Sequence, residues 1–163
     1  MSKYTLLLVD DEEEVIQIII KKMDWDALGF SVVGYAGNGV KALEMVDEYQ
    51  PDVVMTDIKM PYMDGMELAN RIKSEYPATK ILIFTGFDEF EYAKEAVHLE
   101  VEEYLLKPVN SVELTDVFSS LKIKLDQEIS EKQNAEILQK YYMVALPLLQ
   151  ANFYSTLIDG RIR

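Results

Sequence analysis

Residues 51–61 read Pro-Asp-Val-Val-Met-Thr-Asp-Ile-Lys-Met-Pro, and this stretch decides the fold. Val53, Val54 and Met55 form a compact apolar run with two β-branched residues, which predicts a buried strand. Asp57 stands where that strand should end, and a Pro and an Asp-Gly turn signal follow it. Open α/β sheets bind their ligands at the carboxyl ends of the strands, so Asp57 is a candidate site residue. Taken alone, the same aspartate could simply cap the next turn.

Apolar runs of the same kind recur along the chain, and polar residues follow most of them. The runs are 5–9 before Asp10 and Asp11, 31–35, 53–55 before Asp57, 81–84 before Thr85, and 104–106 before Lys107. Apolar residues at helical spacing fill the intervals, at about 12–23, 38–50, 66–75, 89–98 and from 110 onward. Asn38 and Asn110 are the expected N-caps of two of these helices. Strands alternating with helices predict a doubly wound, five-stranded parallel sheet.

The chain beyond this repeat carries a further helical pattern. Residues 126–136 are mostly charged, and apolar residues return from Ile137 to Tyr142 until Pro147 interrupts the pattern. Two helices with a break fit this pattern, and so does one helical linker that pairs with a second chain. We expect residues 1–125 to form one domain, and 126–163 to form a helical linker and the start of a further, truncated region.

The composition restricts the classes of function. The 163 residues carry a net charge of −13, which repels phosphate backbones, so nucleic-acid binding would need chain outside this segment. The absence of cysteine excludes a disulfide framework and a thiolate metal site. Nothing in the sequence resembles a signal peptide or a membrane span, and we expect a soluble cytoplasmic protein with no membrane partner.

The residues that follow the predicted strands suggest one chemistry. Asp10, Asp11, Asp57, Thr85 and Lys107 should converge, because the carboxyl ends of parallel strands lie at the same edge of the sheet. Carboxylates that lie so close repel one another, and a bound Mg²⁺ would relieve that repulsion. A carboxylate nucleophile, a metal ion, an ammonium group and a hydroxyl group together indicate phosphoryl transfer to an aspartate.

Four motifs in this order resemble the receiver domain of bacterial two-component response regulators. They are Leu-Val-Asp-Asp-Glu (8–12), Val-Met-Thr-Asp-Ile-Lys-Met-Pro-Tyr-Met-Asp-Gly (54–65), Thr-Gly (85–86) and Tyr-Leu-Leu-Lys-Pro (104–108). The resemblance covers about residues 3–125 and implies the flavodoxin-like version of the predicted sheet. It also implies a phosphoaccepting switch domain that catalyses only its own phosphorylation and dephosphorylation.

Roles for single residues follow from the resemblance. It makes Asp57 the phosphoacceptor and a Mg²⁺ ligand, and it makes Lys107 and Thr85 the phosphoryl-binding residues. The remaining implied roles are Asp11 as a direct Mg²⁺ ligand, Asp10 as a ligand through water, Lys59 as a ligand through its backbone carbonyl, Thr85 and Tyr104 as the switch pair, and a cis peptide bond between Lys107 and Pro108.

Partners also follow from the resemblance. The phosphoryl donor would be a sensor histidine kinase. A homodimer would form through the linker helix or through the output face, which is the face formed by the predicted helix at 89–98, the strand at 104–106 and the helix from 110 onward. Residues 24–30 and 86–94 resemble the subfamily whose effector is an AraC-type helix-turn-helix, so control of transcription through DNA binding would lie in that effector. Phe87, two residues after Thr85, should slow hydrolysis of the phosphoryl group. Two alternatives remain open: an aspartate-nucleophile phosphohydrolase, which would have Lys59 where such enzymes carry an acid, and a docking module that does not switch.

Overall fold

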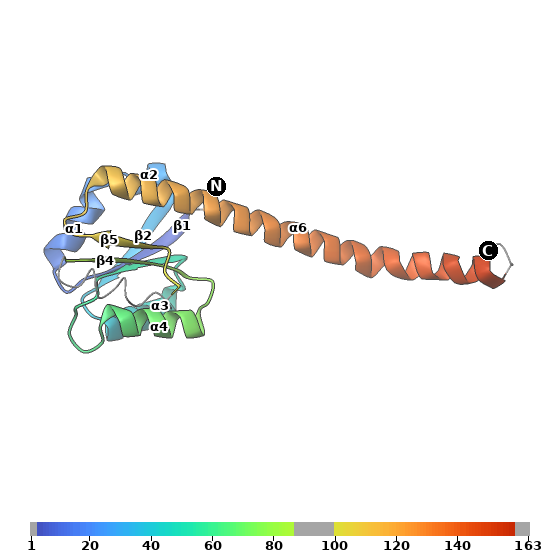
Figure 1. Ribbon diagram of the computed structural model, residues 1–163, viewed down its shortest axis with the longest axis horizontal. Coiled ribbons are helices and arrows are strands. Elements are labelled where there is room, and N and C mark those ends of the chain that lie inside the picture. Colours follow the sequence, from blue (N-terminus) through green and yellow to red (C-terminus); the bar gives the residue numbers. More distant parts are fainter. Residues whose placement is uncertain (1–2, 87–99, 159–163) are drawn as a thin grey trace. The chain divides into compact units, whose positions relative to one another are not determined.

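A computed structural model describes residues 3–86 and 100–158, with side chains up to residue 145, and shows a five-stranded sheet covered by helices (Figure 1). The strands are β1 (Tyr4–Val9), β2 (Phe30–Ala36), β3 (Val53–Thr56), β4 (Lys80–Thr85) and β5 (Glu103–Leu106). The helices are α1 (Glu13–Lys22), α2 (Trp25–Leu28), α3 (Gly39–Tyr49), α4 (Gly65–Glu75) and α6 (Ser111–Ile158). The strand order is β2-β1-β3-β4-β5 and every pairing is parallel, which confirms the predicted fold class. The helix expected over 89–98, and Phe87, lie outside the described residues.

The core lies on both faces of the central strands. Helices α3 and α4 cover one face, and α1, α2 and the first turns of α6 cover the other (Figure 1). On the second face Phe118 packs edge-on against Trp25 and Phe30, with ring centroids 4.8 and 5.1 Å apart. The continuous apolar runs of β1, β3 and β4 are fully buried because both faces are covered.

Polar side chains define the starts of the helices. Asn38 and Asn110 accept backbone hydrogen bonds from Lys41 (2.8 Å) and Glu113 (2.7 Å), which confirms both predicted caps. Asp64 caps α4 in the same way through a 2.8 Å bond from the N–H of the third residue that follows it. The sequence had indicated only a turn at that position.

Two features of the helices differ from the sequence predictions. The short helix α2 was not predicted, and it forms because Trp25 is buried and Gly29 ends the helix with a left-handed φ of 88°. Helix α6 runs without a break from Ser111 to Ile158, so the two-helix alternative and the interruption at Pro147 are wrong. Proline removes one N–H donor from a helix, but the strong helix formers around it favour continuation.

The chain divides into two compact units, Met1–Ser119 and Ser120–Arg163, and α6 contributes to both. In the part of the chain that the structure describes, no helix is both long enough and apolar enough to cross a membrane.

Candidate functional site

Asp10 and Asp57 lie side by side at the carboxyl edge of the sheet. Strands β1 and β3 are neighbours, and their last residues, Val9 and Thr56, pair with each other. Each acid is the residue that directly follows its strand. The N–H of Asp57 donates to the carbonyl of Val9 at 2.8 Å. Asp10 is fully buried and Asp57 is 6% exposed. The sheet topology therefore places two carboxylates together where the surrounding water cannot screen them.

Lys107 contacts the two acids from the end of β5, which is the edge strand beyond β4. The residue follows β5, and its N–H donates to the carbonyl of Thr85 at 2.8 Å. Its ammonium Nζ lies 2.7 Å from Asp10 Oδ2 and 3.1 Å from Asp57 Oδ2, and 5.0 Å from the centroid of the Phe84 ring. One ammonium group thus bridges two buried carboxylates. The peptide bond between Lys107 and Pro108 is cis.

Burial and neighbouring charges shift the pKa values of Asp10 and Lys107. Burial raises the pKa of Asp10 from 3.8 to about 6, and the charge of Asp57 adds to the rise. Hydrogen bonds from Lys107 and from the backbone N–H of Glu12 act in the opposite direction. Burial alone would lower the pKa of Lys107, but its hydrogen bonds to Asp10 and Asp57 and their charges raise the pKa above its ordinary value. The site therefore has more negative charge than its single lysine neutralises.

A group of acids beside this bridge suits a divalent cation. Carboxylate oxygens of Asp10, Asp11 and Glu12 lie within 4.8 Å of one another, and oxygen donors of this kind are what Mg²⁺ prefers. In the sequence Glu12 fits the start of a helix, although three consecutive acids at the end of a strand are also a signal for a cation site. Asp57 is not in that group, and Lys107 links its carboxylate to Asp10. Lys59 is exposed in the loop after β3.

Gly65 holds the loop after β3 close to the site. Its N–H donates to the carbonyl of Ile58 at 2.7 Å. A Cβ atom at position 65 would lie 1.9 Å from the carbonyl oxygen of Asp57, so no other residue fits there without moving the backbone. The Asp-Gly pair therefore caps α4 and sets the position of the residues that follow Asp57.

Thr85 and Tyr104 occupy neighbouring strands at the same edge. Thr85 ends β4 and is 1% exposed, and its Oγ1 has no hydrogen-bond partner among the described residues. A buried hydroxyl without a partner costs free energy, so it is a donor available to a ligand. Tyr104 pairs with Ile83 and packs, half-buried, against the core, and burial raises the pKa of its phenol.

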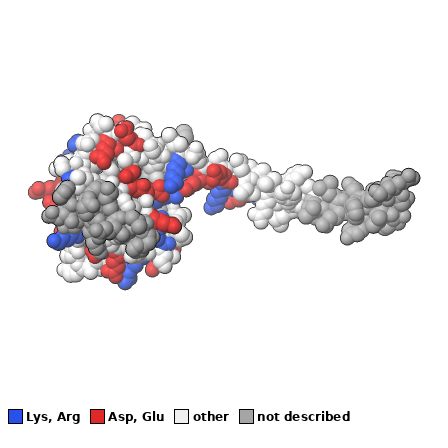
Figure 2. All heavy atoms as spheres, in the orientation of Figure 1, with Lys and Arg blue, Asp and Glu red and all other residues white. Residues whose placement is uncertain are grey.

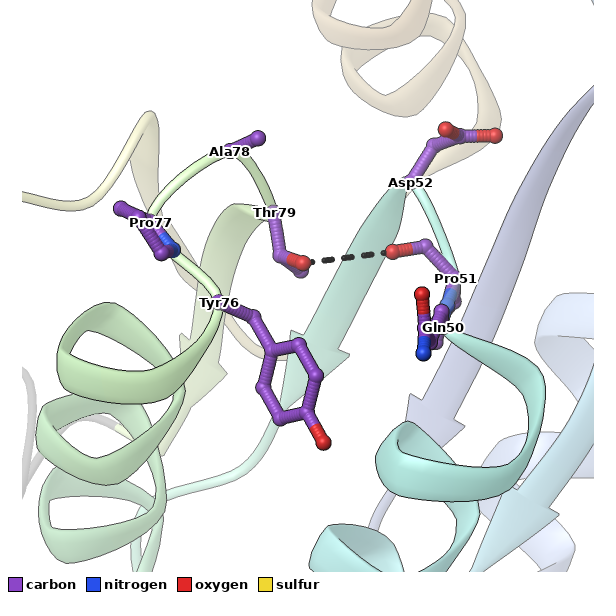
Figure 3. Close-up of a pocket in the computed structure, with 7 residues that line it drawn as sticks. All are labelled: Gln50, Pro51, Asp52, Tyr76, Pro77, Ala78 and Thr79. Atoms are coloured by element: carbon purple, nitrogen blue, oxygen red, sulfur yellow. Dashed lines mark hydrogen bonds between the residues drawn. The ribbon is translucent and has the colours of Figure 1, made fainter.

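The opposite edge of the sheet holds a cavity of about 240 Å³ (Figure 3). Several of its polar side chains form hydrogen bonds within the fold. Thr79 Oγ1 donates to the carbonyl of Pro51 at 3.4 Å, and the Asp52 carboxylate accepts two hydrogen bonds from Thr5. No lysine or arginine lines this cavity, in contrast to the site around Asp57.

Comparisons with known proteins agree with this geometry. Residues 6–119 match the family described as response regulator receiver domain. The chain is 38% identical over 135 residues to an uncharacterized transcriptional regulatory protein, YesN, of Bacillus subtilis, covering 82% of this chain and 37% of that protein. The transcriptional regulatory protein HptR of Staphylococcus aureus is 29% identical over 150 residues, covering 92% of this chain and 58% of its own length. The chain therefore spans between about a third and three-fifths of the length of these relatives.

Solved structures are similar over the same region. The receiver domain of AraT, a response regulator from Geobacillus stearothermophilus, has 38% identity and a TM-score of 0.74, covering 77% of this chain and 97% of that one. A two-component transcriptional regulator AraC from Clostridium phytofermentans has 30% identity and a TM-score of 0.71, with the same coverage.

Proposed function

Because the chain belongs to the response regulator receiver domain family, we propose that Asp57 accepts a phosphoryl group from a phosphohistidine of a sensor histidine kinase. The observation that carries this proposal is the Lys107 ammonium group bridging Asp57 and Asp10 at the carboxyl edge of the sheet. Asp57 has one oxygen toward that ammonium, and the other accepts the N–H of Ile58 at 2.8 Å. The carboxylate is therefore held in one orientation.

The transfer exchanges one bond for another. An Asp57 oxygen forms a bond to phosphorus while the phosphorus–nitrogen bond of the donor breaks, and the imidazole nitrogen keeps the electron pair. Lys107 neutralises negative charge on the transferred group. Asp10, Asp11, Asp57 and the Lys59 backbone carbonyl would hold Mg²⁺, which supplies charge stabilisation when bound.

The site also ends the signal. Attack of water on phosphorus breaks the bond to Asp57 and restores the carboxylate, and this self-dephosphorylation is the only turnover that we assign to the chain. Before that happens, the Thr85 hydroxyl provides a donor for the phosphoryl oxygens. Its movement toward them would leave space that the ring of Tyr104 can fill, which biases a two-state equilibrium at the output face.

The proposed output lies in the rest of the protein. We assign residues 1–125 to the receiver domain and 126–163 to a helical linker and the start of a further region. We also assign an AraC-type DNA-binding effector to that further region, since one similar structure is that of a two-component transcriptional regulator AraC. Acidic side chains are spread over the visible face in Figure 2, as the net charge of −13 requires, so contacts with DNA belong to that effector. We place the protein in the cytoplasm.

Dimerisation would link the receiver to its output. Helix α6 leaves an apolar stripe exposed, with Ile137 66%, Leu138 54%, Tyr141 58% and Tyr142 54% exposed. We assign this stripe to pairing with a second copy of the chain. The output face is the alternative dimer surface. Sedimentation should show that Ile137→Glu weakens the dimer, whereas an unchanged dimer would place the contact at the output face.

Labelling with a small phosphodonor in Mg²⁺ tests the assignment of the phosphoacceptor. Intact-mass measurement should show one added phosphoryl group in the wild type and none in Asp57→Asn. Asp64→Asn is the matched control, because asparagine preserves the cap of α4, and its labelling should be normal. Full labelling of Asp57→Asn would reject the assignment, and steady release of phosphate from a phosphomonoester would favour a hydrolase.

A further inference from the structure

A groove of about 570 Å³ lies between α3 and α4. These two helices are neighbours on one face of the sheet (Figure 1). The groove is lined by Val40, Leu43, Glu44 and Asp47 of α3, by Arg71 and Glu75 of α4, and by Met63 of the preceding loop. The α3 residues recur at intervals of three and four and therefore form one stripe of that helix. The stripe is about 10 Å long at ~1.5 Å per residue, which matches two turns of a bound helix.

One apolar residue that lines this groove is exposed, and so is the residue that precedes Met63 in the chain. Val40 is 43% exposed, and the Tyr62 side chain, next to Met63 in the chain, is 89% exposed. Tyr62 has a φ of 68°, a left-handed conformation that residues other than glycine rarely adopt. Aromatic residues are enriched at protein interfaces relative to the rest of the protein surface.

The rim of the groove is acidic. Glu44, Asp47 and Glu75 contribute three carboxylates, and the single base, Arg71, already pairs with Glu67 of its own helix at 3.4 Å. The hydroxyl of Tyr76 donates to Asp47, which holds that carboxylate in place. An occupant therefore has to bring apolar groups for the centre and positive charge for the rim.

We propose that the α3–α4 groove docks an amphipathic helix of a partner protein, with apolar residues at i, i+3 or i+4, and i+7 and with Lys or Arg beside them. The residues that line this groove do not include those of the Asp10–Lys107–Asp57 bridge.

A designed peptide of Leu and Lys, about four helical turns long, is the probe, and the same peptide with Glu in place of Lys is its counterpart. Backbone amide shifts in NMR spectra of the whole chain should map the Leu/Lys peptide to α3, α4 and residues 62–63. The Leu/Glu peptide should bind at least about tenfold more weakly, because it meets the acidic rim with like charge.

A pair of variants separates the groove from general attraction to an acidic protein. Val40→Lys and Ile18→Lys each place one positive charge at an exposed β-branched residue, and Ile18 lies on α1, away from the groove. Val40→Lys should weaken binding by about tenfold or more, and Ile18→Lys by less than about threefold. If Val40→Lys fails to fold, Glu44→Gln with Glu75→Gln replaces it and should also weaken binding. Equal effects at positions 40 and 18, or shifts confined to α6, would overturn the proposal.

Discussion

Replacing Lys107 by methionine should make the stability of the fold depend strongly on pH. The rise in the pKa of Asp10 from 3.8 to about 6 means that its ionisation costs the folded state about 3 kcal/mol even with Lys107 present, at about 1.4 kcal/mol per pH unit. Lys107 limits this cost through a 2.7 Å hydrogen bond and its charge. Methionine keeps the apolar stem and removes both, so the pKa of Asp10 rises above 6 in the variant.

The direction of the pH dependence follows from the two protonation states. A raised carboxyl pKa in the folded protein means that stability falls as the pH rises from the unfolded pKa to the folded one. In the wild type this fall ends near pH 6, whereas in Lys107→Met it continues to the higher pKa of Asp10. The titration of Lys107 adds no pH dependence between pH 5 and pH 8, because its raised pKa keeps it protonated throughout. The loss of unfolding free energy caused by Lys107→Met should therefore be larger by about 2 kcal/mol at pH 8 than at pH 5.

Urea unfolding between pH 5 and pH 8, without metal ions, measures this difference. Lys122→Met is the matched control, because Lys122 pairs with Asp126 at 2.8 Å but both side chains are partly exposed. Its loss should stay near or below about 0.5 kcal/mol at every pH. A deficit for Lys107→Met that is equal at pH 5 and pH 8 would refute the reasoning, since it would show that Asp10 does not carry the cost.

Three further outcomes are expected. Gly65→Ala should cost about 1–3 kcal/mol in urea unfolding, because its Cβ would collide with the Asp57 carbonyl oxygen, while Gly37→Ala, with nothing within 4 Å, should change stability by less than about 0.5 kcal/mol. Phe118→Ala should lower the unfolding free energy by about 3–5 kcal/mol, because it removes a fully buried ring that contacts two other rings. Mg²⁺ should raise the melting temperature more at pH 8 than at pH 5, because a proton on Asp10 competes with the cation, and chelator should reverse the gain; an equal rise at both pH values would contradict this.

The sequence by itself determined the sheet and the edge where the site lies. Apolar runs that end in Asp10, Asp57 and Lys107 predict buried parallel strands, and parallel strands bring their carboxyl ends together whatever the loops between them do. The caps at Asn38 and Asn110 were equally predictable, because a cap is a contact between residues three positions apart.

Only the tertiary structure decided how the groups at that edge meet. Periodicity says that Lys107 follows the fifth strand, but not that its ammonium reaches past β4 to bridge two acids from β1 and β3. Burial raises the pKa of Asp10 and leaves the Thr85 hydroxyl without a partner among the described residues, and both effects depend on every chain segment that excludes water. Helix α2 likewise exists because the ring of Trp25 is buried against Phe118, almost a hundred residues away. Sequence patterns record local preferences, whereas distances and desolvation arise from contacts between distant segments.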